Sequence, residues 1–513
     1  MEVLLDNILI FIIFTPLVAA LLILFLPKDE KNLIRWVALV FSLLTLIFVL
    51  FAWFNYDRVD AGFQFQVLED WFPEIGASFH LGVDGISLPL LLLTGILTPL
   101  AILASFRIED NTKPYMILFL LLEAAMLGLF VSLDLVIFFI FWEFGLVPMY
   151  FLIRYWGSKD RRYASFKFMI YTMAGSLGLL LAIQVIGLSM GTFDILELYD
   201  IWVNYGGDTL PGTNLSTSLF KAIAFWAFII AFAIKIPVWP FHTWLPDAHT
   251  EAPTAGSMIL AGVLLKLGAY GFIRLSIPLF PEQAHTTAWL LAIAGMLSII
   301  MGGYAAFGQW DFKRLVAYSS INHMGFVVMG IAVMAWVYGA EASNLQMRQD
   351  AIFGTSGAVL QMFNHGLSAA GMFFLVGVIY DRAHTRQLRD YGGLWSILPF
   401  FAGALIFTSM ASLGLPGLNG FVGEFMITRS AWNPFTIQIA LSMLGLLMTG
   451  AYILKGIGYT LHGEVNPRWQ NLSDMNLREH LVIWPLMILM LSLGVWPQWL
   501  LAVINDTVTK IFY

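Results

Sequence analysis

The sequence predicts an all-α polytopic membrane protein with about fourteen transmembrane helices. The 513 residues are 59% hydrophobic and only 12% charged, apolar stretches of membrane-spanning length recur along the chain, and two of these stretches contain clustered Pro or Gly. A soluble domain carries about 25% charged residues. Lipid must therefore replace water around most of this protein.

The predicted spans follow one another through almost the whole chain. A helix needs roughly 20 apolar residues to cross the hydrocarbon core of a bilayer. Stretches near this length occupy residues 8–26, 33–54, 86–106, 115–130, 133–153, 164–188, 219–241, 253–277, 287–307, 315–338, 352–380, 397–428, 435–461 and 481–504. We do not expect the first to be a signal peptide, because Glu2 and Asp6 precede it in place of basic residues.

The basic residues predict the orientation of the spans. Lys and Arg accumulate in alternate loops, including residues 28–35, 154–167, 313–314 and 382–389, and such loops are cytoplasmic. Both termini are therefore expected on the non-cytoplasmic side, together with the mainly acidic loops at residues 55–85 and 189–218. Arg274 and Lys455 lie near span ends, where we expect their charges to extend toward the membrane surface.

Composition also excludes several classes of function. The formal net charge is −7 and basic clusters are absent, which argues against nucleic acid as a partner. The chain has no Cys. It can therefore form neither disulfides nor cysteine-ligated iron–sulfur clusters.

A set of ionisable residues lies inside the predicted spans, where a charge costs on the order of 2.5 kcal/mol or more. These residues are Glu123, Glu143, Lys235, Lys266, His323, His365 and Glu424. Each side chain can gain or lose a proton, and burial and neighbouring charges decide when it does so. A row of such groups across the middle of a membrane predicts a proton path.

Other interpretations of these side chains stay open at this point. A Glu/Lys pair can be a static bridge that fixes helix packing. His323 and His365 could hold a haem only as two facing axial ligands. His242, His249 and Glu251 follow the seventh stretch and could ligate a metal, although their spacing is not that of a zinc protease.

Two predicted spans are interrupted beside an ionisable residue. In the seventh span, Pro237 and Pro240 follow Lys235, and in the twelfth span Pro416 and Gly417 precede Glu424. Proline removes a backbone donor and breaks a helix, and irregular backbone inside a membrane is tolerated only against protein or a water-filled cavity. Paired interruptions of this kind indicate repeats with ion sites at the breaks.

The spacing of the interruptions predicts how the chain is organised. The interrupted spans are five apart, so a second five-helix copy would enter the membrane from the opposite side and be inverted. We expect a single transmembrane domain over residues 1–513. Its parts are three helices in residues 1–113, a first repeat in 114–278, a second, inverted repeat in 286–462 and a C-terminal helix in 480–505.

Three motifs resemble the antiporter-like membrane subunits of respiratory complex I, the proton-pumping NADH:quinone oxidoreductase. They are Trp-Glu at residues 142–143 with Pro148, Lys-Ile-Pro-Val-Trp-Pro-Phe-His-Thr-Trp-Leu-Pro-Asp-Ala-His at residues 235–249, and Asp-Phe-Lys-Arg-Leu-Val-Ala-Tyr-Ser-Ser at residues 311–320 followed by His323. The resemblance covers nearly the whole chain and implies fourteen transmembrane helices with inverted five-helix repeats. Glu424 stands where most members have Lys, as is typical of the M type.

The resemblance also implies roles for the buried residues. Glu143 and Lys235 resemble the coupled pair, Lys266 the central relay, His323 and His365 the bridging groups, Glu424 the outlet and Glu123 an auxiliary carboxylate. It implies no redox cofactor on this chain. NADH or ferredoxin, flavin, iron–sulfur clusters and quinone would belong to partner subunits.

The same resemblance implies the surroundings of the chain. Its partners would be other membrane subunits of the complex, including antiporter-like neighbours and a quinone-site module. We expect the bacterial cytoplasmic membrane as its location, although a thylakoid or organellar membrane would suit the same residues. The alternative is a subunit of a multi-subunit sodium/proton antiporter, because those proteins share most of these motifs.

Overall fold

The computed structural model describes residues 2–340 and 344–513. In this part of the chain, 13 helices are long and apolar enough to cross a membrane. The remaining predicted stretch, residues 397–428, contains the two shorter helices α18 and α19. The predicted all-α membrane fold is therefore confirmed.

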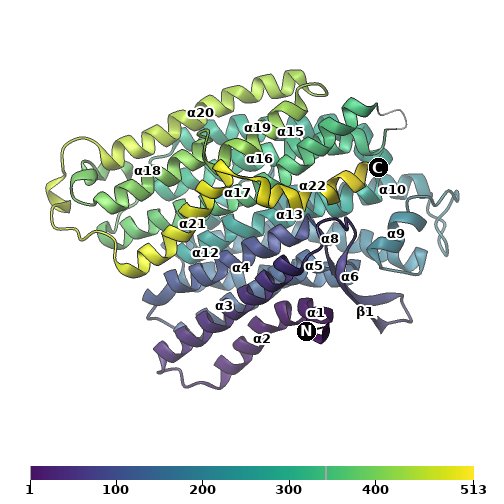
Figure 1. Cartoon of the computed structure of the whole chain (residues 1–513), viewed down its shortest axis with the longest axis horizontal. Helices are drawn as coiled ribbons and strands as arrows, with labels where there is room; N and C mark the ends of the chain where they lie inside the picture. The colour runs from purple at the N-terminus through teal and green to yellow at the C-terminus, as the bar shows by residue number, and fades with distance from the viewer. Residues whose placement is uncertain (1, 341–343) are drawn as a thin grey trace.

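The first helices form one edge of the molecule, where α2 and α3 lie below the other helices in Figure 1. Pro16 lies inside α2. The elements before the sixth helix are α1 Glu2–Asp6, α2 Ile8–Phe25, α3 Lys31–Asn55, β1 Gln64–Phe72, β2 Ala77–Val83, α4 Ser87–Ala104, the 3₁₀ turn η1 Ser105–Arg107 and α5 Thr112–Val131. The strands β1 and β2 pair antiparallel, with Leu68 opposite His80.

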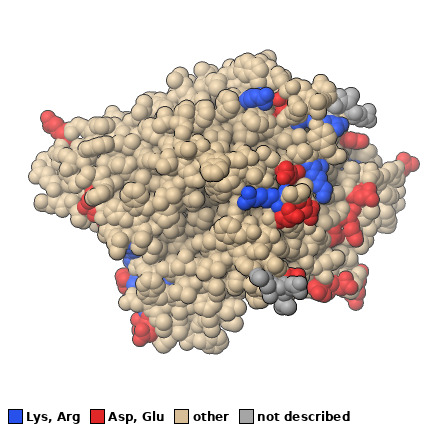
Figure 2. Space-filling view, viewed as in Figure 1, with Lys and Arg blue, Asp and Glu red and all other residues tan. Residues whose placement is uncertain are grey.

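The hairpin of β1 and β2 differs from the loop that was expected at residues 55–85. It is fixed to the helices by polar contacts: Ser78 donates its backbone N–H to Asp134 (3.0 Å), and the His80 ring is hydrogen-bonded to Asp194. Its outer residues include exposed acidic side chains, which gather toward the right of Figure 2. These acidic residues are Glu69, Asp70 and Glu74, and the exposed Asp57 and Asp60 precede the hairpin.

The middle of the chain contains the first broken span and a span with wide turns. The elements are α6 Leu135–Phe144, α7 Leu146–Trp156, α8 Arg161–Met190, α9 Ile195–Ile201, α10 Thr217–Lys235, α11 Trp244–Glu251, α12 Thr254–Ile259, η2 Leu260–Leu264, α13 Leu265–Gly271, η3 Phe272–Ser276 and α14 Ile277–Leu279. The turns η2 and η3 are π-helical. The helix α9 lies in the second acidic loop, where no helix was expected.

The last part of the chain contains the second broken span. Its elements are α15 Pro281–Gly308, α16 Phe312–Tyr338, α17 Leu345–Ala383, η4 Leu388–Asp390, η5 Leu394–Ser396, α18 Pro399–Leu413, α19 Asn419–Ala431, α20 Thr436–Leu461, η6 Pro467–Trp469, α21 Leu477–Val495 and α22 Gln498–Phe512. The final predicted stretch, residues 481–504, is divided between α21 and α22. Pro497 lies at this division, where its missing N–H cannot continue a helix.

The most buried helices pass through the middle of the bundle. The span from α12 to α14 and the helix α17 are surrounded by protein, and α13 and α17 lie centrally in Figure 1. The helices α3, α8 and α20 instead leave one face exposed. Figure 1 also places both termini and the β1–β2 hairpin toward its right side. The buried centre positions the ionisable residues described next.

Candidate functional site

Glu143 and Lys235 lie on α6 and α10, and Lys235 contacts the ring of Trp142, the residue before Glu143. Glu143 is half-buried in the last turn of α6, and Lys235 is the final residue of α10 and 4% exposed. Among the described residues, no ion pair within 4.0 Å joins the two side chains, although the charge of Glu143 acts on Lys235. The Lys235 Nζ atom instead lies 4.7 Å from the centroid of the Trp142 ring.

Trp142 is held in place by its own hydrogen bond. Its indole N–H donates to the Ser176 hydroxyl at 2.9 Å, and that hydroxyl donates to the Thr172 carbonyl at 3.1 Å. A cation over an indole face is attracted by about 0.5–2 kcal/mol. The uncharged Trp142 ring thus stabilises the Lys235 ammonium. Trp142 directly precedes Glu143 in the sequence.

The break after Lys235 packs directly against the next span. A Cβ atom at Gly268 would lie 2.7 Å from the Phe232 carbonyl oxygen and 2.8 Å from the Ile236 Cγ1 atom. Glycine at residue 268 therefore allows α13 to approach the end of α10. No hydrogen bond or ion pair joins Lys235 to Lys266 within the described ranges, so any proton transfer between them needs water or side-chain movement.

Lys266 lies in the short α-helical segment between the two π-helical turns and is 0% exposed. Its Nζ atom donates to the Ala261 carbonyl of the first π-helical turn, and it lies 2.8 Å from the Nδ1 atom of His365. The Nε2 atom of His365 has no hydrogen-bond partner in the part of the chain that is described. This free nitrogen is a place where a proton or a water molecule can attach.

His323 continues the row from His365 to Glu424. The two histidine ring centroids are 5.8 Å apart, and the His323 Nδ1 atom lies 2.8 Å from the Glu424 Oε1 atom. On its other side, the His323 Nε2 atom lies 3.2 Å from the Tyr452 hydroxyl. Four of the predicted residues, Lys266, His365, His323 and Glu424, thus lie in one buried row, in which the described residues show no hydrogen bond between the two histidines.

The break between α18 and α19 positions Glu424. Gly414 and Gly417 have φ angles of +81° and +95°, in the left-handed region that favours glycine. Gln361 of α17 donates to Glu424 at 3.0 Å. Next to it, Asn364 and Asn419 donate to each other's backbone carbonyls at 2.7 and 3.0 Å, which joins α17 to the start of α19.

Glu123 stands apart from the other predicted residues. It is 0% exposed and accepts a hydrogen bond of 2.8 Å from Ser42 of α3. Its second carboxylate oxygen has no hydrogen-bond partner among the described residues. The structure does not connect it by a hydrogen bond to Glu143 or to the row at Lys266.

Two basic residues are buried where surface positions were expected. Lys313, assigned to a cytoplasmic loop, is 6% exposed and donates its ammonium to the Ala252 carbonyl. Arg274 was expected to extend toward the surface, but it is 5% exposed and paired with Asp84 at 2.5 Å. A partner distant in sequence retains each charge inside the protein, and hydropathy alone does not indicate such partners.

Lys455 agrees with the expectation for a residue near a span end. It is half-buried, and its ammonium donates to the Phe307 and Gln309 carbonyls at 2.6 and 2.7 Å.

Tyr452 and Gln361 were not predicted as site residues. Both are uncharged, and only their contacts with His323 and Glu424 reveal them.

His249 also lies nearer to the centre than the sequence suggested. It is 0% exposed, and its ring stacks on Phe373 with centroids 4.4 Å apart. Across residues 2–340 and 344–513, no group of three or more His, Cys, Asp or Glu side chains is arranged to hold a metal ion. The described residues therefore offer proton donors and acceptors, and they give no geometric support for the metal interpretation of His242, His249 and Glu251.

The chain is similar to known membrane proteins over almost its full length. The family described as "NADH:quinone oxidoreductase/Mrp antiporter, TM" matches residues 132–449. NADH-quinone oxidoreductase subunit M of Rhodobacter capsulatus is 40% identical over 512 residues, covering 99% of this chain and 96% of the relative. NADH-ubiquinone oxidoreductase chain 4 of Marchantia polymorpha is 37% identical, covering 98% of this chain and 96% of the relative.

Solved structures give the same result for the fold. A chain of respiratory complex I from Thermus thermophilus has 26% identity and a TM-score of 0.84, with 98% of this chain and 100% of that chain covered. A chain of the Mrp complex from Dietzia has 20% identity and a TM-score of 0.81, with 99% and 98% covered, and so shares the fold. The chain therefore belongs to the family of NADH:quinone oxidoreductase and Mrp antiporter membrane subunits, within its subunit M (chain 4) group.

Proposed function

We propose that the chain is a proton-translocating membrane subunit of a complex I-type quinone oxidoreductase, with NADH or ferredoxin as electron donor. The strongest support is the buried row Lys266, His365, His323 and Glu424, in a chain whose relatives are subunit M proteins. In this proposal the chain itself carries no redox centre. Flavin, iron–sulfur clusters and quinone belong to other subunits, and quinone reduction there drives proton movement here.

The proposed driving element is the pair Glu143 and Lys235. When the Glu143 carboxylate approaches, Lys235 retains its proton, and when the carboxylate withdraws, Lys235 releases the proton toward Lys266. The Lys235 Nζ atom lies 4.7 Å from the Trp142 ring centroid, and this contact helps to hold the ammonium until the proton is released. The proton then passes His365 and His323 to Glu424, the proposed outlet, while Glu123 serves as an auxiliary carboxylate.

The energies of these steps are compatible. Two unit charges 4 Å apart interact by about 4 kcal/mol at an effective dielectric constant of 20. Moving one charge against 100 mV requires about 2.3 kcal/mol. The energy needed to separate one Glu/Lys pair is therefore comparable to the work of moving one proton against 100 mV.

The organisation of the chain in the membrane is part of the same proposal. Residues 114–278 and 286–462 would form two inverted five-helix repeats, which the breaks after Lys235 and after Leu413 support. Both termini would face the non-cytoplasmic side of a bacterial cytoplasmic membrane or of the corresponding organellar or thylakoid membrane. Antiporter-like neighbours and a quinone-site module would be its partners.

The test is donor-driven proton uptake in membrane vesicles carrying Glu143→Ala, measured together with the amount of intact complex. We expect loss of proton uptake and of coupled turnover in a fully assembled complex. Glu282→Ala, which removes an exposed carboxylate from the first turn of α15, is the matched control and should pump normally. Normal pumping by Glu143→Ala, also when combined with Glu123→Ala, would refute the proposed switch.

A second candidate is a subunit of a sodium/proton antiporter, favoured by the fold shared with the Mrp chain. Vesicles without an electron donor distinguish the two functions. Sodium-dependent proton exchange in those vesicles would support the antiporter. Proton uptake only in the presence of donor supports the proposed pump.

A further inference from the structure

We infer that Arg274 and Asp84 form a fixed charge barrier that closes the hairpin side of the central span to protons. The central span is the one from α12 to α14. The inference rests on the proposed function, because a barrier is needed there only if protons reach Lys266. The pair belongs to neither the Glu143/Lys235 switch nor the row that leads to Glu424.

The charges of the pair are fully engaged with each other and with the backbone. The Arg274 Nη2 atom lies 2.5 Å from the Asp84 Oδ2 atom, and the side chains are 6% and 2% exposed. The other Asp84 oxygen accepts from the backbone N–H groups of Ile86 and Ser87 at 3.0 Å each and from the Ser87 hydroxyl at 3.2 Å. Both Asp84 oxygens are therefore occupied by hydrogen bonds, so Asp84 is poorly placed to carry protons onward.

The guanidinium is also held by aromatic rings from two parts of the chain. Its central carbon lies 4.7 Å from the Phe63 ring centroid, just before β1, and 5.5 Å from the Tyr270 ring centroid. The Tyr270 hydroxyl donates to the Phe130 carbonyl at 3.0 Å, and the Tyr199 hydroxyl of α9 donates to the Arg274 carbonyl at 2.6 Å. These contacts fix the cation to the hairpin side of the span.

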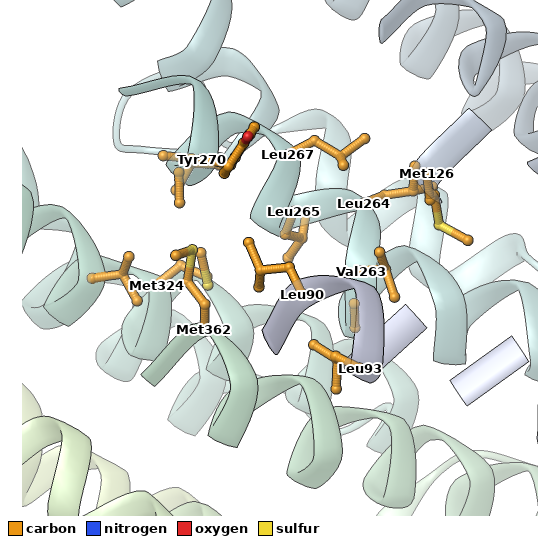
Figure 3. Packing of buried hydrophobic residues seen from close by; sticks show 14 of the residues in the cluster. Leu90, Leu93, Met126, Val263, Leu264, Leu265, Leu267, Tyr270, Met324 and Met362 are labelled. Carbon is orange, nitrogen blue, oxygen red and sulfur yellow. The ribbon is translucent and has the colours of Figure 1, made fainter. Parts of the chain in front are cut away.

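Lys266, Tyr270 and Arg274 follow one another at intervals of four residues. At 1.5 Å per residue, Lys266 and Arg274 are separated by about 12 Å along the span. The Lys266 ammonium points the other way, since it donates to the Ala261 carbonyl on the opposite side. Figure 3 shows buried apolar side chains around this segment, among them Leu90, Leu265, Met324 and Met362.

A guanidinium at this position can repel protons without conducting them. Arginine stays protonated in proteins, so it accepts no proton for transfer. The span around it is buried, so a proton that approached Arg274 from the hairpin side would meet a fixed group that cannot relay it. The barrier would direct the proton at Lys266 sideways to His365, and it would stop protons from returning from the hairpin side.

The inference is tested by passive proton flux into proteoliposomes that contain the intact complex and no electron donor. Arg274→Met removes the charge but keeps an unbranched side chain. Because Arg274→Met leaves the Asp84 carboxylate without its cation, that carboxylate becomes available to take up a proton, and we expect flux under an imposed pH gradient to rise several-fold. Arg274→Lys keeps a cation and should leave the flux near the wild-type value.

Further variants separate a barrier from a structural ion pair. Arg382→Met breaks another buried pair, with Glu479 at 2.7 Å, and should lower stability without raising proton flux. If Arg274→Met does not assemble, Arg274→Gln removes the charge but can still donate to Asp84, and it should leak in the same way.

The double variant Arg274→Met/Lys266→Met decides whether the leak passes through Lys266. A leak that disappears in the double variant supports the inference. Normal proton flux in assembled Arg274→Met would overturn the inference, and Arg274→Gln takes its place if Arg274→Met does not assemble. A leak that persists in the double variant would overturn the inference as well. The proposed function fails by a different result, namely normal donor-driven pumping by Glu143→Ala.

Discussion

The Nζ atom of Lys266 lies 2.8 Å from the Nδ1 atom of His365, although the two residues are 99 positions apart. An ammonium can only donate, so a charged Lys266 requires the unprotonated Nδ1 of His365 as acceptor. The two groups therefore share one proton-binding position at the contact, and their protonation is coupled. In the proposed function, this contact joins Lys266 to the part of the row that leads to Glu424.

Replacing Lys266 is expected to interrupt the path at this contact. Lys266→Met keeps the apolar stem but removes the amine that contacts His365, and we expect donor-driven proton uptake to fall about 100-fold or more. Fluorescence of a pH-sensitive dye in vesicles measures the uptake. Intact complex must be quantified in the same vesicles, since uptake near the wild-type level in assembled Lys266→Met would contradict the path.

The charge of Glu424 is expected to matter more than its hydrogen bonds. Glu424→Gln is nearly the same size and can still contact His323 and Gln361, but it cannot bind and release a proton. We therefore expect strong loss of pumping with little change in stability. Tyr452→Phe removes one hydrogen bond to His323, typically about 1 kcal/mol, and should slow pumping only several-fold. Equal effects of both variants would argue for a packing role.

Replacing Lys235 distinguishes a transporting subunit from one in which the buried charges only pack helices. Lys235→Met removes the ammonium that contacts the Trp142 ring, and the proposed switch requires that pumping stops while the complex still assembles. Trp142→Phe keeps an aromatic face but loses the hydrogen bond to Ser176, so it should reduce pumping partially. Pumping at the wild-type rate by Lys235→Met would show that the charges only pack helices.

Gly268 is expected to control the packing of the first break. In Gly268→Ala the added Cβ would lie 2.7 Å from the Phe232 carbonyl oxygen, so α13 must move away from α10 at a cost of about 1–3 kcal/mol. Less intact complex and a lower unfolding temperature should follow. Gly458→Ala in α20 is the control, because its Cβ meets nothing within 4 Å. An unchanged unfolding temperature for Gly268→Ala would mean that the break tolerates displacement.

Asp194 is expected to stabilise the hairpin in a pH-dependent way. Burial alone would raise its pKa, but the His80 side chain and the backbone N–H groups of Glu197 and Leu196 outweigh burial and lower the pKa. A carboxyl group with a lowered pKa in the folded state stabilises above its ordinary pKa of about 3.9, and this stabilisation is lost as the pH falls through the folded-state value. Asp194→Asn should therefore weaken the hairpin at neutral pH.

Hydrogen exchange of the β2 backbone amides measures that effect. Exchange should be faster in Asp194→Asn than in the wild type at neutral pH, and the difference should shrink as the pH falls below about 4. Glu69→Gln, on the exposed face of β1, is the control. Equal protection of β2 in both proteins at neutral pH would show that Asp194 does not anchor the hairpin.

The sequence predicts the membrane spans well because each of them needs a long apolar stretch, and the 39-residue helix α17 is found where residues 352–380 indicated one. The break after Lys235 is also predicted, because Pro237 and Pro240 cannot continue a helix. Burial of six of the seven predicted residues follows from their place inside apolar stretches, and Glu143 is half-buried. Their roles in proton transfer remain predictions.

Other features depend on partners that no local pattern announces. Arg274 and Lys313 are near span ends in the sequence, and only Asp84 and the Ala252 carbonyl explain why their charges stay inside. The β1–β2 hairpin was not predicted either, because most of the outer strand is exposed or only partly buried. Its pairing is stabilised by Asp134 and Asp194 from distant segments.

The two π-helical turns around Lys266 make its orientation sensitive to chain length. A wide turn accommodates one more residue than an α-helical turn, and each residue of an α-helix contributes a rotation of about 100°. Deleting a single residue from η2, such as Ala261, would allow a regular helix to form there. Lys266 would then be rotated by roughly 100° relative to the helix before the deletion. Its amine would no longer contact His365, although the amine itself would be unchanged.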